Sequence, residues 1–272
     1  MSNFLQRTIT GAIFVILIVG SILWNHYAFS FLFLIFTILG ISEFYSIISK
    51  TGSKPYGFSG VVISALLFLI TSYIAISNSN IHFILILIPL IFIDLIIELF
   101  RKHKTPFINV ALSYAGILYI SLPMSLLNFL SNPGFIHGIY IKGILLGFFL
   151  LIWSNDTFAY LTGIKFGRHK LFERISPKKT WEGSIGGLFF SLLTAYIISL
   201  FIKELSPLQW LGMALITVVF GTLGDLVESM LKRSLNIKDS GNILPGHGGI
   251  LDRFDAVLLA APFVYIYLVL VI

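Results

Sequence analysis

The sequence predicts an all-α, polytopic integral membrane protein with about nine transmembrane helices and a cytoplasmic N-terminus. Hydrophobic residues make up 57% of the 272 positions, whereas charged residues make up only 11%. A water-soluble domain needs more polar surface than this composition supplies. Apolar runs long enough to cross a bilayer recur along the whole chain, and they lack the alternating pattern of a membrane barrel.

Nine apolar segments are expected to be helices, because backbone groups in lipid must find their hydrogen-bond partners within the segment. The predicted spans are residues 5–24, 28–48, 57–77, 80–99, 107–129, 140–163, 182–202, 207–231 and 250–272. The first span has no small-residue cleavage site, so we expect it to be retained rather than removed as a signal peptide. Residues 1–272 are expected to form one membrane domain, with motif-free helices over 1–130 and the helices and loops that carry the candidate site over 140–272.

The distribution of charge predicts the orientation. With the N-terminus inside, all but Lys142 and Lys203 of the 18 lysines and arginines fall on the inner side. This bias is the positive-inside pattern of membrane proteins. Of the 12 acidic residues only Glu204 falls toward the outer side, although topology does not require this. The sequence therefore predicts a polar site at the cytoplasmic face.

Composition also excludes several classes of site and partner. The chain has no cysteine, which excludes disulfides, thiolate catalysis and cysteine-based metal centres. Its six histidines lack the helical spacing of a zinc site, and those outside the glycine-rich loop are expected at interfaces. The formal charge of +6 indicates contact with anionic membrane lipids rather than with nucleic acid, because basic loops in membrane proteins follow topology.

Five carboxylates near predicted cytoplasmic helix ends are the first candidates for chemistry. Asp156 lies late in the sixth span, Asp225 and Glu228 lie late in the eighth, and Asp252 and Asp255 open the ninth. Ionised groups at membrane depth are costly, and oxygen ligands suit Mg²⁺ or Mn²⁺. A buried salt bridge to Lys232, Arg233 or Arg253 is an equal alternative for any single acid. The gathering of the whole set at one depth favours a divalent cation.

Two loops offer donors for phosphate groups. The glycine-rich loop, residues 238–249, precedes a helix start, and such loops present backbone amides to anions. Its candidate binding residues are Gly246, His247, Gly248 and Gly249, with the cations Lys232, Arg233, Lys238 and Arg253 around them. The basic loop, residues 165–183, contributes Ser176, Lys178, Lys179 and Thr180. The alternatives are a simple turn for the first loop and a solvated, lipid-touching segment for the second.

Residues 229–255 resemble the C-terminal motif of the phosphatidate cytidylyltransferases, also called CDP-diacylglycerol synthases. The matching positions are Ser229, Lys232, Arg233, Lys238, Asp239, Gly241, Pro245, His247, Gly248, Gly249, Asp252, Arg253 and Asp255. Residues 155–163 and 176–183 also resemble this family. The long motif is the specific signal, and the two shorter blocks support it.

The resemblance implies that CTP and phosphatidic acid give CDP-diacylglycerol and pyrophosphate, with Mg²⁺ required. It implies a bacterial inner membrane location with the site facing the cytoplasm. It also implies that Asp225 and Asp252 hold metal, with Asp255 and Asp156 as further candidates and a second cation left open. The catalytic set is completed by the motif residues Lys232, Arg233, Lys238, Asp239 and Arg253, whose cations are expected to stabilise the leaving pyrophosphate.

Two other functions fit parts of the sequence. A CTP-dependent lipid-alcohol kinase would also need Mg²⁺ and a basic cytoplasmic site, but it would release CDP. A transporter would place charge along a path across the membrane, whereas here the charge is gathered on one side. The sequence does not decide between a monomer and a homodimer.

Overall fold

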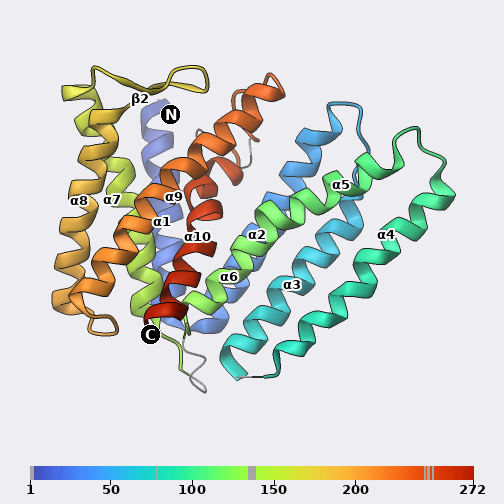
Figure 1. Ribbon diagram of the computed structural model, residues 1–272, viewed down its shortest axis with the longest axis horizontal. Helices are drawn as coiled ribbons and strands as arrows, with labels where there is room; N and C mark the ends of the chain where they lie inside the picture. Colours follow the sequence, from blue (N-terminus) through green and yellow to red (C-terminus); the bar gives the residue numbers. More distant parts are fainter. Residues whose placement is uncertain (1–2, 78, 134–138, 242, 244–245, 247) are drawn as a thin grey trace. The chain divides into compact units, whose positions relative to one another are not determined.

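The computed structural model describes every residue except 1–2, 78, 134–138, 242, 244–245 and 247 (Figure 1). The chain forms two compact units. Unit 1 comprises Met1–Tyr140 and Ile237–Phe254, and unit 2 comprises Ile141–Asn236 and Asp255–Ile272. The boundary at residue 140 falls where the predicted catalytic half begins. The segment that carries the glycine-rich loop nevertheless belongs to unit 1.

The described residues contain eight helical segments that are long and apolar enough to cross a membrane. They are His26–Ser49, Gly57–Ser77, Ile81–Arg101, Pro106–Leu130, Lys142–Phe166, Trp181–Phe201, Pro207–Ser234 and Leu251–Val271. These segments correspond to the second to ninth predicted spans and confirm the all-α polytopic fold. The first predicted span lies in α1 (Asn3–Trp24), whose apolar part, Thr8–Trp24, is shorter. The ninth crossing and the orientation stay predictions.

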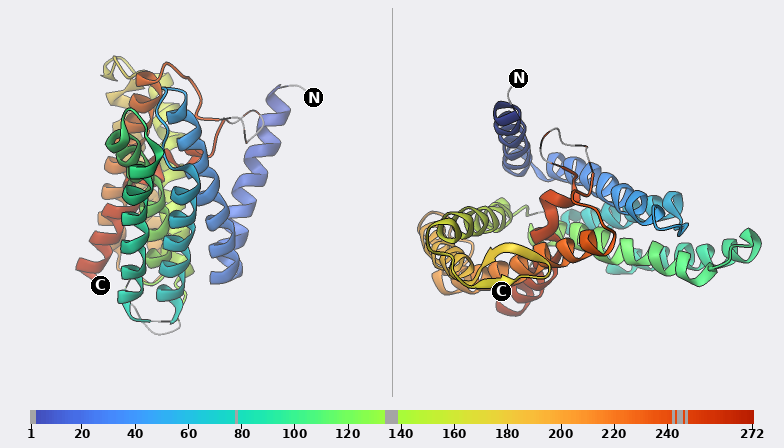
Figure 2. Two further views of the ribbon diagram at one scale, coloured as in Figure 1. Left: turned by 90° about the vertical axis from the view of Figure 1, so that its right-hand side faces the viewer. Right: turned by 90° about the horizontal axis from the view of Figure 1, so that it is seen from above.

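Unit 1 is built around α3. Its elements are α1, α2 (His26–Ser49), α3 (Gly57–Ser77), η1 (Ile81–Ile86), α4 (Leu87–Arg101), α5 (Pro106–Gly116), η2 (Ile117–Ser121) and α6 (Leu122–Leu130). Helix α3 packs against α2, α4 and α6, and Figure 2 shows α2, α3 and α4 side by side. Short connections between these helices make neighbours in sequence neighbours in space.

One span of unit 1 is interrupted. Between α5 and α6 the chain widens into the π-helical turn η2, just before Pro123. Proline has no N–H to donate into the preceding turn, and its ring needs extra room there. A π-helical turn supplies this room without ending the helix.

Buried polar side chains join three helices of unit 1. The Ser72 hydroxyl of α3 lies 2.7 Å from that of Ser30 and 2.9 Å from Nε2 of His26, both in α2. Ser30 also donates to the Asn128 side-chain oxygen of α6 at 3.4 Å. His26 is only 3% exposed, so its ring is packed among the helices of unit 1. In a lipid-embedded unit such hydrogen bonds specify which helices pair.

Unit 2 consists of α7 (Lys142–Phe166), a short β-hairpin, α8 (Trp181–Phe201), α9 (Pro207–Ser234) and most of α10 (Leu251–Val271). Helix α7 packs along α8, and α9 contacts both. The hairpin strands β1 (Lys170–Phe172) and β2 (Ser176–Thr180) are antiparallel, with Lys170 opposite Thr180. The hairpin lies across the ends of α7 and α8 (Figure 1). It replaces the irregular basic loop that the sequence predicted.

Close packing in unit 2 depends on Gly147 of α7, where a side-chain carbon would overlap the indole ring of Trp210. Trp210 is fully buried. We therefore expect Gly147→Ala to lower the free energy of unfolding by about 1–3 kcal/mol, measured by denaturant unfolding in detergent. Gly20→Ala in α1 is the control, because no described atom outside its own helix backbone lies within 4 Å of its added carbon. An equal loss in both variants would contradict this packing argument.

Candidate active site

The β-hairpin presents the predicted phosphate donors of the basic loop. Lys178 is exposed, Ser176 and Lys179 are half-buried, and Thr180 is buried. The Thr180 hydroxyl accepts the Gly183 N–H at 3.2 Å and caps the N-terminus of α8. Thr180 therefore has a structural role, because it anchors the hairpin to the helix that follows it.

Glu182 holds the other side of the hairpin, although sequence reasoning gave it no role. Its carboxylate accepts the backbone N–H groups of Arg168 and His169 at 3.1–3.2 Å, and it lies 2.6 Å from Nδ1 of His169. An acidic residue in the first turn of a helix is a recognisable signal, because the helix dipole favours it there. Arg233 adds a further link, since its Nε donates to the Ile175 carbonyl at 3.5 Å. The hairpin is thus fixed to α8 and α9.

Lys179 and Asp225 meet within unit 2. The Lys179 ammonium lies 2.6 Å from Oδ2 of Asp225, and Ser229 donates to Oδ1 of the same carboxylate at 3.2 Å. The two ion-pair side chains are 26% and 35% exposed, so the protein does not fully enclose the pair. A residue predicted to bind substrate and a residue predicted to hold metal therefore occupy one site.

Further carboxylates surround Asp225. The charges of Asp225, Glu228 and Asp156 all act on Asp255, which places these three acidic groups of unit 2 within electrostatic range of Asp255. Glu228 is buried and pairs with Lys232 one helical turn away, so the salt-bridge alternative is confirmed for Glu228. Among the described residues, no three histidine, aspartate or glutamate side chains stand ready as metal ligands. The gathered acids nonetheless fit a cation, because their mutual repulsion favours added positive charge.

Asp252 organises the glycine-rich loop in unit 1. Its Oδ2 accepts the Ser240 N–H at 3.0 Å, the Ser240 hydroxyl at 3.0 Å and the Gly249 N–H at 2.8 Å. Gly246 and Gly248 adopt left-handed backbone angles, with φ of 77° and 81°, that favour glycine. The Gly249 amide faces Asp252, so its contact in this structure is internal to the loop.

The remaining predicted site residues of unit 1 are exposed or lie outside the described residues. Lys238, Asp239, Gly246 and Arg253 are exposed, and Gly248 is half-buried. His247 and Pro245 are among the residues that the structure does not describe. The loop therefore offers cations and backbone amides on its accessible side, and Asp252 holds its ends together.

Glu43 of α2 also contacts this loop, and no sequence pattern predicts that contact. Its Oε2 accepts the Ser240 hydroxyl at 3.1 Å and the Leu251 N–H at 2.9 Å. Glu43 lies 197 residues from Ser240, so no local spacing relates the two positions.

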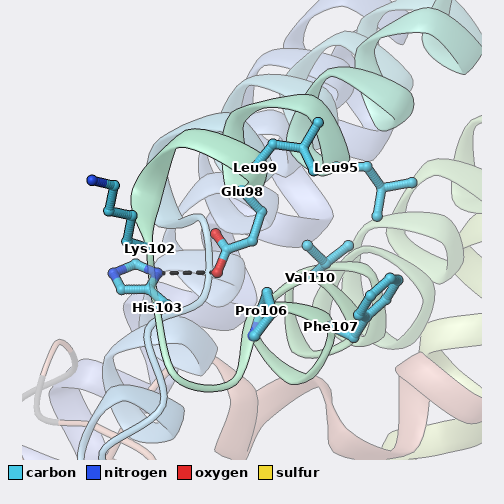
Figure 3. A pocket seen from close by; sticks show the side chains of 8 residues that line it. All are labelled: Leu95, Glu98, Leu99, Lys102, His103, Pro106, Phe107 and Val110. Atoms are coloured by element: carbon cyan, nitrogen blue, oxygen red, sulfur yellow. Dashed lines mark hydrogen bonds and ion pairs between the residues drawn. The ribbon is translucent and has the colours of Figure 1, made fainter.

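A separate pocket of about 300 Å³ lies between α4 and α5 (Figure 3). Glu98 at its edge lies 3.1 Å from Nδ1 of His103 and accepts from Tyr56 and from Asn109, while Lys102 points away. Burial raises the pKa of the Tyr56 hydroxyl, which therefore stays protonated and donates. Among the described residues, none from the three motif blocks lines this pocket. Its polar groups join the end of α4 and the start of α5 to the segment before α3.

Comparison with known proteins places this arrangement in a family. Residues 5–271 match the model of the cytidylyltransferase family. A phosphatidate cytidylyltransferase of Staphylococcus aureus (strain COL) is 40% identical over 185 residues, covering 67% of this chain and 68% of the relative. One of Bacillus subtilis (strain 168) is 52% identical over 124 residues, covering 44% and 45% of the two chains. Because the family match spans nearly the whole sequence, the chain belongs to the cytidylyltransferase family.

Proposed function

We propose that this chain is a phosphatidate cytidylyltransferase, which transfers CMP from CTP to phosphatidic acid and releases pyrophosphate. The family match over residues 5–271 carries the proposal. The relatives named as phosphatidate cytidylyltransferases support this choice of substrates. The eight apolar helices support a lipid substrate, because acyl chains stay in the bilayer while CTP arrives from the cytoplasm. We propose that the site faces the cytoplasm of a bacterial inner membrane.

The reaction needs charge neutralisation and alignment more than it needs a base. The lipid phosphate is already an anion, and its oxygen attacks the α-phosphorus of CTP. The new P–O bond forms as the bond to the β-phosphate breaks, so pyrophosphate carries away the electron pair. The protein must relieve the repulsion between two polyanions and hold them in line.

The acidic residues are proposed to hold the metal ion. The gathered carboxylates of unit 2 support Asp225, with Asp255 and Asp156 as further candidates, and the motif supports Asp252. A bound Mg²⁺ would neutralise charge on the reacting phosphoryl oxygens. A cation at Asp225 would compete with Lys179 for the carboxylate. Lys179 would then be available to an incoming phosphate, which gives the observed ion pair a part in substrate binding.

The basic residues are proposed to hold the leaving group. Lys232, Arg233, Lys238 and Arg253 supply positive charge, and the amides of Gly246 and Gly248 supply neutral donors in the left-handed turns of the loop. Donors fixed before the reaction stabilise developing charge without reorganisation. Ser176 and Lys178 on the hairpin are proposed to contact the nucleotide or the lipid phosphate.

One assay tests the proposed reaction. Purified protein with phosphatidic acid and labelled CTP is expected to form a labelled liponucleotide and an equal amount of pyrophosphate, and chelation of Mg²⁺ should abolish both. Product analysis by thin-layer chromatography and a pyrophosphate assay distinguish the alternatives. Release of CDP with phosphorylation of an added lipid alcohol would instead support a kinase, and no turnover of CTP would contradict both.

A further inference from the structure

We propose that Glu43 is a positioning residue for the glycine-rich loop. From helix α2 its carboxylate holds Ser240 and the start of α10, and it thereby keeps the loop in the form that meets the phosphates of CTP. The inference rests on the proposed function, since it concerns how the same loop binds nucleotide. Glu43 lies outside every block of sequence that carries the resemblance to the family.

The contacts of Glu43 span both ends of the loop. A single oxygen, Oε2, accepts the Ser240 hydroxyl at 3.1 Å and the Leu251 N–H at 2.9 Å. Ser240 lies near the beginning of the loop, and Leu251 is the first residue of α10. One carboxylate oxygen therefore fixes the distance between the two ends.

The Ser240 hydroxyl couples Glu43 to Asp252. Its oxygen lies 3.1 Å from Glu43 Oε2 and 3.0 Å from Asp252 Oδ2, yet a hydroxyl has one hydrogen to donate. The two carboxylates therefore share this donor, and the loss of Glu43 changes the hydrogen bonding of Asp252. This arrangement links a residue of α2 to a predicted metal ligand.

Stability alone does not explain a carboxylate at this position. Glu43 is only 6% exposed, and its Oε1 is buried without a hydrogen-bond partner among the described residues. A buried acid with an unsatisfied oxygen is costly, and an apolar side chain of similar size would avoid that cost. Such departures from the best packing are expected where function sets the requirement.

Two glycines of the motif make room for Glu43. A side-chain carbon added at Gly241 or at Gly249 would overlap the Glu43 carboxylate, and at Gly249 it would also overlap the Ser240 hydroxyl. Gly249 is buried and Gly241 is half-buried. The absence of side chains at these positions therefore lets the loop close against α2, in addition to freeing its backbone.

Kinetics with both substrates test the proposal. We expect Glu43→Ala to lower kcat/KM for CTP about 10- to 100-fold, mainly through a higher KM, because a small displacement of binding groups is costly. Glu43→Gln keeps an acceptor oxygen and should recover part of the loss, and Ser240→Ala should shift KM in the same direction. Ser42→Ala is the matched control, since within the described residues its hydroxyl donates only to the Ile38 carbonyl of the same helix. Wild-type KM for CTP in the Glu43 and Ser240 variants would overturn the proposal.

A second measurement does not depend on catalysis. Lys238 at the start of the loop is exposed, and trypsin cleaves after lysine when the local backbone opens. Cleavage after Lys238 should be about tenfold faster in Glu43→Ala than in the wild type, with Ser42→Ala unchanged. An unchanged cleavage rate in the Glu43 variants would overturn the proposal.

If the wild-type chain formed no liponucleotide, the proposed function would fail, while the cleavage rates would still decide whether Glu43 holds the loop. If Glu43→Ala does not fold, Glu43→Gln and Ser240→Ala carry both measurements.

Discussion

Asp225→Asn is expected to lower kcat by about a hundredfold to a thousandfold, which is the range for loss of a preorganised electrostatic group in an active site. Asparagine has nearly the size of aspartate, so the packing of α9 should survive. The charge that attracts Lys179, 2.6 Å away, and any divalent cation would be lost. The measurement is the rate of liponucleotide formation as a function of Mg²⁺ concentration, alongside thermal unfolding of the same preparations.

Two further variants separate the metal from the ion pair. Lys179→Ala removes the ammonium group that pairs with Asp225 but leaves the Asp225 carboxylate in place. It should therefore raise the KM for a substrate, while the rate should still depend on Mg²⁺. Glu204→Gln neutralises an exposed acid of unit 2 outside the predicted site and should behave as the wild type. Near-normal turnover by Asp225→Asn at ordinary Mg²⁺ concentrations would exclude Asp225 as a metal ligand.

Asp252→Asn is expected to reduce turnover by about a hundredfold or more, because the reaction loses the negative charge of Asp252 and not because the loop changes its structure. The asparagine oxygen can still accept the N–H groups of Ser240 and Gly249, so the loop should keep its shape. Only the negative charge is removed. The measurements are turnover at saturating CTP and trypsin cleavage after Lys238, which should stay close to the wild-type rate.

Ser240→Ala is the informative comparison for Asp252. It deletes a hydrogen bond to the same carboxylate but leaves the charge in place. If Asp252 acted only by holding the loop, Asp252→Asn would lose no more activity than Ser240→Ala. A much larger loss in Asp252→Asn supports a direct role for its charge in the reaction.

The sequence predicted the membrane helices well because hydrophobic runs and the charge between them are local properties. It also placed Lys179 and Asp225 among the site residues, although separate roles were expected for them. The Glu228–Lys232 pair was accessible from sequence as well, since residues four apart in a helix face each other.

Other features depend on contacts between distant segments. The β-hairpin arises where Glu182 and Thr180 tie a short basic stretch to α8, and its few residues carry little periodicity of their own. Glu43 contacts residues 197 and 208 positions away, which no spacing rule relates. A buried acid in an apolar helix was visible in the sequence, but its partner was not.

The assignment of Ile237–Phe254 to unit 1 has a consequence for biosynthesis. A ribosome makes α2 early, yet the groups that hydrogen-bond to Glu43 are translated some 200 residues later. Until then the nascent membrane bundle holds an acid that lacks these donors. A chain truncated before residue 237 would retain this defect permanently, and such fragments are natural targets for quality-control proteases.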